Sequence, residues 1–333
     1  MKTVTVKFAA FVLLVCIVPC FLHALGGEER TRQNLTIYGI KGSSGVGIIR
    51  LFEEAPVIPG FNVKVEALAQ ADLVAARFIS GEAKIGILPP NVAAKIASSS
   101  PGGKLKAAAI IGNGMLSLLS SDPAVKSIED LRGKTVEVAG QGATPDYVFR
   151  KILAGGGLVP DRDVFLSYSL AHPEIAQSLI AGRISTALLP EPFAAMVKMG
   201  KPDIKSVIDV QDAWKRSGGS SNYPMTLLVV DSAFASANAG AVESILDAVK
   251  KSIEWVTAFP KEAGALVEKH ELGIKAAVAE AAIPGSNYVY IPASEGRSSL
   301  EALFRVFLEY APVSIGGVLP GNDFYRSPDA GKP

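Results

Sequence analysis

Two glycine-containing segments of this chain combine small residues, hydroxyl groups and a predicted helix start. They are "KGSSG" (41–45), with Gly42, Ser43 and Ser44, and "GQGATPD" (140–146), with Gly142, Ala143 and Thr144. Glycines let backbone N–H groups approach a ligand, and the first turn of a helix leaves such groups without intrahelical partners. Each segment therefore predicts a receptor for an anionic or strongly hydrogen-bonding group. The alternative for each is an ordinary helix cap in a loop.

Two proline turns form a second set of candidate binding residues. "LPPN" (88–91) contains Pro90 and Asn91, and "LPEPF" (189–193) holds Glu191 between two prolines. A carboxylate in such a stiff turn is suited to accept hydrogen bonds from an amine, an amidine or a ring N–H, or else it simply stabilises a helix N-terminus. Asn91 either caps the next helix or faces the ligand. Tyr223 is a candidate to stack on a ligand, with burial in the core as the alternative.

The two sets of turns are related by an internal repeat. At an offset of 101 residues, "LTIYGIKGSSGVGIIRLF" (35–52) aligns with "VEVAGQGATPDYVFRKIL" (136–153), which places Ser43 on Thr144. At the same offset, "ISGEAKIGILPPNVAAKIA" (79–97) aligns with "IAGRISTALLPEPFAAMVK" (180–198). The spacing is too long for a solenoid repeat. It predicts two similar lobes, each with one glycine turn and one proline turn.

Short apolar segments alternate with helical ones in both copies. We expect strands near 35–39, 63–67, 84–88, 134–139, 163–168 and 185–189, and helices near 45–54, 71–80, 91–98, 145–155, 173–181 and 192–199. This alternation predicts parallel βαβ units and an α/β fold. Parallel sheets bind ligands outside the carboxyl ends of their strands, where all four turns lie. Between the copies, "SIEDL" (127–131) predicts a capping box from Ser127 to Asp130.

After residue 205 the chain no longer follows the repeat. "SVIDV" (206–210) and "MTLLVVD" (225–231) read as strands, and "WKRSGGSSNYP" (214–224) reads as a polar connector. "AGAVESILDAVKKSIEWVTAFP" (239–260) has the spacing of an amphipathic helix, with Ile245, Val249 and Ile253 on one face. We expect these elements to pack back on the first lobe.

Composition and motif content argue against several classes of function. The formal charge of the 333 residues is only +1, so nucleic acid is not an expected partner. Beyond residue 26 the only histidines are His172 and His270, too far apart for a metal-binding motif. No nucleophile or phosphate-binding motif is found. We therefore expect no catalytic residues, no metal and no cofactor.

The first 26 residues have the features of a secretory signal peptide. A basic start precedes the apolar run "FAAFVLLVCIVPCFL", and small residues follow it. The alternative, a membrane anchor, is less favoured because the run is short and contains Pro19. Both cysteines, Cys16 and Cys20, lie in this segment, so the exported protein has no disulfide. Cys20 is a possible lipidation site, although the residues around it match that motif loosely.

The segments "SIEDLRGKTVEVAGQGATPDYVFRKILAGGGLVPDRDV" and "LIAGRISTALLPEPFA" resemble the substrate-binding proteins of bacterial ABC importers. The similar branch contains alkanesulfonate, taurine and nitrate receptors and thiamine-precursor receptors. The resemblance implies a type II periplasmic-binding-protein fold, with residues 28–122 and 226–333 in lobe 1 and 123–225 in lobe 2. It places hinge crossings near 121–126 and 222–226.

The resemblance also implies a function and a site. The expected protein is exported to the periplasm or the outer face of the membrane and is monomeric. It captures a small polar solute, either a sulfonate- or nitrate-like anion or a pyrimidine-like heterocycle, and passes it to a permease with its ATPase. Binding positions carried over from the family are Ser43, Ser44, Pro90, Asn91, Ala143, Thr144 and Glu191. An enzyme on the same scaffold and a sensory binding module remain as alternatives.

Overall fold

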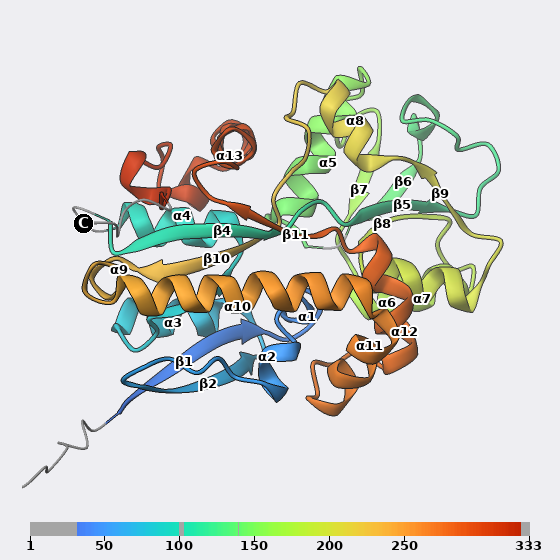
Figure 1. The fold of residues 1–333 in the computed structure, drawn as a ribbon. Coiled ribbons are helices and arrows are strands. Elements are labelled where there is room, and N and C mark those ends of the chain that lie inside the picture. Colours follow the sequence, from blue (N-terminus) through green and yellow to red (C-terminus); the bar gives the residue numbers. More distant parts are fainter. Residues whose placement is uncertain (1–31, 100–102, 139, 328–333) are drawn as a thin grey trace, which may run out of the picture. The chain divides into compact units, whose positions relative to one another are not determined.

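The computed structural model describes residues 32–99, 103–138 and 140–327. The predicted signal peptide and Cys20 lie outside these residues. Within the described residues the chain forms two sheets, each with helices against it (Figure 1). This arrangement confirms the predicted two-lobed α/β fold.

The first sheet has six strands in the order β11-β4-β10-β3-β1-β2. Their bounds are β1 (Gln33–Ile40), β2 (Phe61–Leu68), β3 (Ile85–Leu88), β4 (Leu105–Gly112), β10 (Thr226–Asp231) and β11 (Tyr288–Pro292). β1 pairs in parallel with both β2 and β3, whereas β10 is antiparallel to β3 and β4. The strands of the first repeat copy are therefore joined by strands from later in the chain.

The second sheet has five strands in the order β7-β6-β8-β5-β9. Their bounds are β5 (Leu116–Ser120), β6 (Thr135–Val138), β7 (Phe165–Ser167), β8 (Thr186–Pro190) and β9 (Lys205–Ile208). β6 pairs in parallel with β7 and β8, and β5 is antiparallel to β8 and β9. The sub-orders β2-β1-β3 and β7-β6-β8 are the same, and each continues into an antiparallel strand. The internal repeat is therefore a structural one.

The helices flank these sheets. The bounds are α1 (Ser43–Val46), α2 (Arg50–Glu53), α3 (Ala71–Ser80), α4 (Pro90–Ser98), α5 (Thr144–Gly155), α6 (His172–Ile180), α7 (Phe193–Gly200), α8 (Val210–Arg216), α9 (Ser232–Ala237), α10 (Ala239–Ala258), α11 (Pro260–Lys269), α12 (Ala276–Ala282) and α13 (Arg297–Tyr310). Short 3-10 turns are η1 (Glu129–Leu131), η2 (Ile283–Gly285), η3 (Pro312–Ile315) and η4 (Asn322–Phe324). One apolar core spans both sheets, and a smaller one lies between the second sheet and helices α6 and α7. None of the helices in the described ranges has the length and apolar character needed to span a bilayer.

Three expectations differ from the structure. The strand expected over 206–210 and assigned to the first lobe is β9, which pairs with β5 in the second sheet. The helix expected over 45–54 is split into α1 and α2, because Gly47 ends α1 and glycine is a poor helix residue. The connector expected from residue 214 is wrong at its start, because α8 continues to Arg216 and buries Trp214. Asp209 caps α8 by accepting from the N–H groups of Gln211 and Asp212. The amphipathic helix is confirmed as α10, with Ile245, Val249 and Ile253 buried.

The chain passes from the first sheet to the second between Gly112 and Leu116. Gly114 lies at this crossing, and its N–H donates to Asn222 Oδ1 at 3.0 Å on the returning segment. Its carbonyl accepts from Asn287 Nδ2 at 3.2 Å and from Gln211 Nε2. A Cβ at Gly114 would lie 2.3 Å from the Tyr223 ring, so only glycine fits between these segments. The two connections between the sheets are thus tied to one another.

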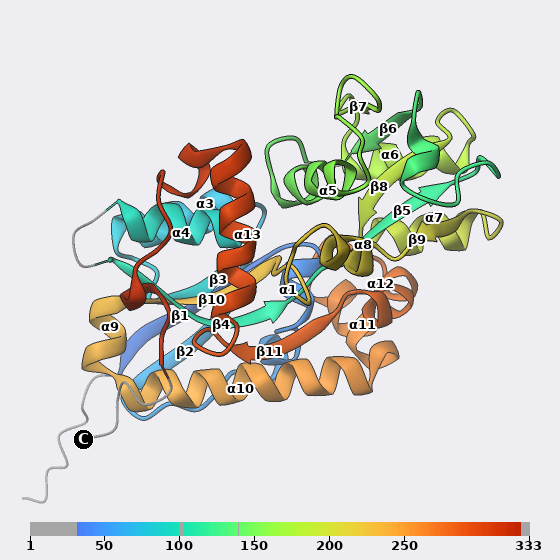
Figure 2. The ribbon, with the colours of Figure 1, turned by 90° about the horizontal axis from the view of Figure 1, so that it is seen from above.

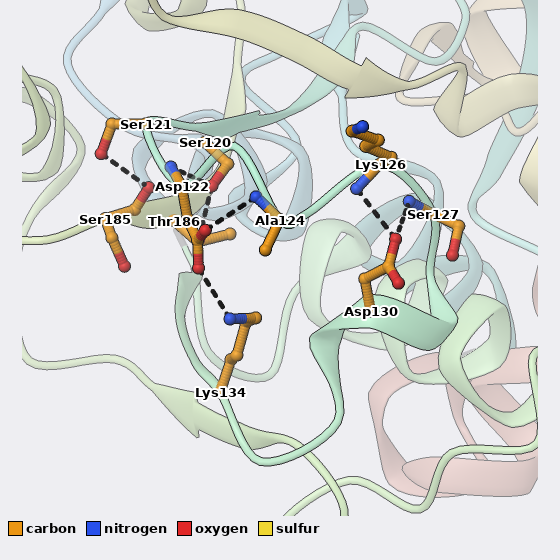
Figure 3. Close-up of polar contacts among 10 residues, drawn as sticks. All are labelled: Ser120, Ser121, Asp122, Ala124, Lys126, Ser127, Asp130, Lys134, Ser185 and Thr186. Carbon is orange, nitrogen blue, oxygen red and sulfur yellow. Dashed lines mark hydrogen bonds and ion pairs between the residues drawn. The ribbon is translucent and has the colours of Figure 1, made fainter.

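The segment expected to be the first hinge, 121–126, follows β5 and lies beyond the crossing. Figure 3 shows how it is anchored: Ser120 Oγ and Thr186 Oγ1 are 2.9 Å apart, and Lys134 Nζ donates to Asp122 at 2.6 Å. Asp130 accepts from the N–H groups of Lys126 and Ser127, which provides the carboxylate half of the predicted capping box. The lobe boundaries stay a prediction, and the strand pairing favours a first crossing at 113–115 over one at 121–126.

Candidate functional site

The first glycine turn presents backbone donors at the carboxyl end of β1. Gly42 has a φ of 86°, and its N–H donates to Leu272 O at 2.8 Å, which fixes the turn. Ser43 and Ser44 begin α1 and are partly exposed. Within the described ranges no acceptor is found for their N–H groups. These two N–H groups and their hydroxyls stay candidates for ligand binding.

The second glycine turn is built differently from what its sequence predicts. Gly142 donates its N–H to Asp146 Oδ2 at 2.9 Å, and Ala143 donates its own to Gly140 O at 3.1 Å. These two donors are therefore used inside the turn. Ala143, not Thr144, is the N-cap residue of α5, and Thr144 is the first helical residue with 5% of its surface exposed. The N–H of Thr144 has no acceptor among the residues described.

Asp146 organises this turn and was not identified from the sequence. It is 3% exposed, and its Oδ1 accepts from Arg150 Nε at 2.7 Å and from the Tyr168 hydroxyl at 2.6 Å. Burial, together with the hydrogen bond to Asp146, raises the pKa of Tyr168. Arg150 also pairs with Asp161 at 3.2 Å, so its charge is balanced by two carboxylates. The signal in the sequence was the acidic residue at the second position of the helix predicted over 145–155.

Glu191 directly follows β8 and is 5% exposed. Its Oε2 accepts from the N–H of Ala195 at 2.9 Å, whereas Oε1 faces Gly285, where a Cβ would lie 2.8 Å away. Burial raises the pKa of Glu191, and the bond from Ala195 and the charge of Lys198 oppose this shift only in part. Such a carboxyl is a strong acceptor for a ligand N–H when it is ionised.

Gly285 faces Glu191, and three residues later Tyr288 contacts the first glycine turn. Its hydroxyl donates to Ser43 O at 2.8 Å, so it holds the first glycine turn. Burial raises the pKa of Tyr288, and the charge of Glu191 raises it further. Segment 285–288 therefore contacts Ser43 of the first half through Tyr288 and faces Glu191 of the second half through Gly285. The sequence carried no signal for Tyr288.

Strand pairing places the second turn and Glu191 at one edge. β6 and β8 are neighbours with Val138 opposite Leu188, so the glycine turn after β6 and Glu191 after β8 leave the sheet side by side. His172 and Phe193 begin α6 and α7 at this same edge, with ring centroids 5.3 Å apart. Burial lowers the pKa of His172, which favours its neutral ring. This aromatic pair was missed because the two residues are far apart in the chain.

Three candidates lie apart from this region or are covered. Pro90 is buried as the first residue of α4, and Asn91 lines a groove between α3 and α4 with Asp72 and Ile79. Tyr223 is 0% exposed and packs edge-on against Trp214 at 5.7 Å. The expectation that the Tyr223 ring stacks on a ligand is therefore wrong for this conformation, because neighbouring segments cover the ring. No group of three or more metal-ligating side chains is found in the described part of the chain.

These features give the two-lobed α/β architecture of the type II periplasmic-binding-protein fold, with the candidate site residues at the edges of two sister sheets. A family model described as "NMT1/THI5 like" matches residues 60–263, which is more than half of the chain. The chain belongs to this family.

Solved structures share the fold at low sequence identity. An ABC transporter protein from Parabacteroides distasonis is 24% identical with a TM-score of 0.75, over 89% of this chain and 99% of its own. The periplasmic aliphatic sulphonate binding protein SsuA from Escherichia coli is 16% identical with a TM-score of 0.66, over 83% and 87%. The periplasmic nitrate-binding protein NrtA from Synechocystis is 12% identical with a TM-score of 0.57, over 88% and 84%. A search of curated protein sequences finds no match.

Proposed function

We propose that this protein is the exported, non-catalytic solute-binding component of an ABC importer. The observation that carries the proposal is that one segment of the first half meets both turns: Tyr288 contacts Ser43, and Gly285, three residues before it, faces Glu191 of the second half. Family membership and the fold shared with periplasmic binding proteins support it. The solute is held between the lobes and passed to a membrane permease with its ATPase.

The proposed mechanism is a shift of population between an open and a closed form. A ligand favours closure only through contacts that the open form does not make. Here those contacts are the N–H groups and hydroxyls of Ser43 and Ser44 on one lobe, with Glu191 and the N–H and hydroxyl of Thr144 on the other. The crossings at 113–115 and 217–225 are the proposed hinge, since the sheets join there.

The chemistry of the region favours a neutral N–H-bearing heterocycle over a fully ionised sulfonate. The unpaired Glu191 Oε1 accepts from an amine or ring N–H and repels an anion. The guanidinium of Arg150 is already balanced by Asp146 and Asp161. The His172–Phe193 pair, with its rings tilted by 37°, places two aromatic rings at the same edge for a heterocycle to contact. A pyrimidine with an exocyclic amine has the matching groups.

Calorimetry on the exported protein tests the function and the ligand class together. Native mass spectrometry first identifies any co-purified solute. A 4-aminopyrimidine and a short alkanesulfonate are then titrated into the wild type and into the double variant Ser43→Ala, Thr144→Ala. We expect the aminopyrimidine to bind and the double variant to bind it at least about tenfold more weakly, about 1.4 kcal/mol.

The matched control is Ser244→Ala, which removes an exposed serine hydroxyl on α10. It should leave the affinity unchanged. Equal affinities of the double variant and the wild type would contradict the proposed site. Turnover of the bound compound would instead support an enzyme on this scaffold.

A further inference from the structure

Tyr147 connects the second glycine turn to the opposite half of the molecule. It lies in the first turn of α5, three residues after Thr144. Its hydroxyl end reaches the turn, because a Cβ at Gly142 would lie 3.7 Å from the Tyr147 oxygen. Its ring packs on α13, with centroids 5.3 Å from Phe307 in an edge-on pair and 6.1 Å from Tyr310 in a stacked pair.

The two helices belong to different lobes. α5 contacts β8 and α8 beside the second sheet, whereas α13 contacts α4 and η3 beside the first. Figure 2 shows α13 next to α5, and their contact is direct. Phe307 is 0% exposed, so the Tyr147 ring covers an apolar surface that lobe opening would uncover. One turn further on, Lys151 pairs with Glu309 at 3.3 Å on the same two helices.

We propose that Tyr147 is a positioning residue that couples the binding turn to lobe closure. Its ring, packed on Phe307 and Tyr310, favours the closed arrangement before a ligand arrives and holds the Gly142–Thr144 turn in place. A ligand on that turn then closes a protein that is already biased toward closure, so its apparent affinity rises. This inference rests on the two-lobed binding function proposed above.

The test measures lobe separation in the ligand-free exported protein. Fluorescence energy transfer is recorded between dyes on Lys64→Cys in β2 and Asp203→Cys before β9, both exposed positions. The only native cysteines, Cys16 and Cys20, lie in the predicted signal peptide. Tyr147→Ala should raise the open-to-closed ratio by about tenfold, the effect expected for one aromatic contact.

Three further variants make the test specific. Tyr310→Ala, on the partner helix, should shift the ratio in the same direction and keeps the test available if Tyr147→Ala is poorly folded. Tyr147→Phe keeps the ring, and Lys151→Ala removes only an exposed ion pair, so both should change the ratio less than about twofold. Melting temperatures confirm that each variant is folded.

The outcomes separate this inference from the proposed function. Wild-type transfer efficiency in folded Tyr147→Ala and Tyr310→Ala would overturn the coupling, even if the protein binds a solute. If Lys151→Ala and Tyr147→Ala changed the open-to-closed ratio by the same amount, the role of the Tyr147 ring would be overturned. A shift specific to the rings in a protein that binds none of the titrated solutes would support the coupling and contradict the proposed ligand class.

Discussion

Gly285 and Glu191 belong to different halves of the molecule, and a Cβ on Gly285 would lie 2.8 Å from Glu191 Oε1. Because glycine has no side chain, the buried Glu191 carboxylate fits where η2 of the first half meets the turn after β8 of the second. Gly285 is exposed and its φ is not in the left-handed region, so space rather than backbone strain requires glycine here. This contact is a direct probe of the junction between the lobes.

Gly285→Ala should displace Glu191 and weaken solute binding without unfolding the protein. The added methyl group meets the end of one side chain, so we expect the carboxylate to rotate out of place. An affinity loss of about tenfold for the 4-aminopyrimidine, measured by calorimetry, corresponds to one lost charged hydrogen bond. Wild-type affinity in Gly285→Ala would show that Glu191 does not contact the solute from this position.

Glu191→Gln should raise thermal stability at neutral pH and leave it unchanged in acid. Because burial raises the pKa of Glu191 above 4.5, the native state keeps a proton over a pH range in which the unfolded chain has lost it. The free energy of unfolding therefore falls as the pH rises through that range, and the cost persists above it. Melting temperatures at about pH 4 and about pH 7.5 measure the effect.

The exposed residue Glu254 provides the control, since Glu254→Gln should show no such pH-dependent gain. If the melting temperatures of Glu191→Gln and the wild type differ by the same amount at both pH values, ionisation of Glu191 has no energetic cost. Solute affinity should also fall in acid for the wild type, because the protonated carboxyl is a weaker acceptor. Glu191→Gln should lack this pH dependence.

Asp146→Ala should be strongly destabilising. The substitution removes the carboxylate that accepts the Gly142 N–H. It also removes the nearer ion-pair partner of Arg150, and the Arg150 side chain is only 22% exposed. Removing one partner of a buried ion pair costs about 3–5 kcal/mol of stability. Because Arg150 keeps its ion pair with Asp161, we expect a loss at the lower end of this range. Urea unfolding gives the change in the free energy of unfolding.

Asp212→Ala is the matched control for that measurement. Asp212 also pairs with an arginine four residues along its helix, but both side chains are more than half exposed. Pairs of this kind contribute about 0.3–0.5 kcal/mol. Equal losses for Asp146→Ala and Asp212→Ala would be evidence against an organising role for Asp146.

Gly114→Ala should destabilise the crossing between the sheets. The new Cβ would lie 2.3 Å from the buried Tyr223 ring, and overpacking of this kind costs about 1–3 kcal/mol. Gly240→Ala, in the first turn of α10, adds a methyl group with no atom within 4 Å and should be neutral or stabilising by about 0.4–1 kcal/mol. Urea unfolding gives the free energy of unfolding of both variants. A Gly114→Ala protein as stable as the wild type would contradict the close packing at the crossing.

Much of the fold follows from local patterns in the sequence. The alternation of short apolar strands with helices predicted the parallel units, and α3, α4, α6 and α7 lie within two residues of their predicted ranges. The repeat at offset 101 placed Ser43 on Thr144, and each is the first residue of a helix after the first strand of its copy. These features depend on neighbours in the chain, so a single sequence contains them.

The binding region depended on contacts between distant segments. Sequence analysis predicted that Gly142 and Tyr223 contact the ligand. In the structure Asp146 accepts the Gly142 N–H, and the segments at the crossing cover Tyr223. Tyr288 and Gly285 are about a hundred residues from Glu191 and carry no motif. The sequence by itself determined which elements form and how they repeat, because strand and helix periodicity are local. Only the tertiary structure decided which backbone donors stay free and which side chains meet, because burial and hydrogen-bond partners are set by chain segments far apart in sequence.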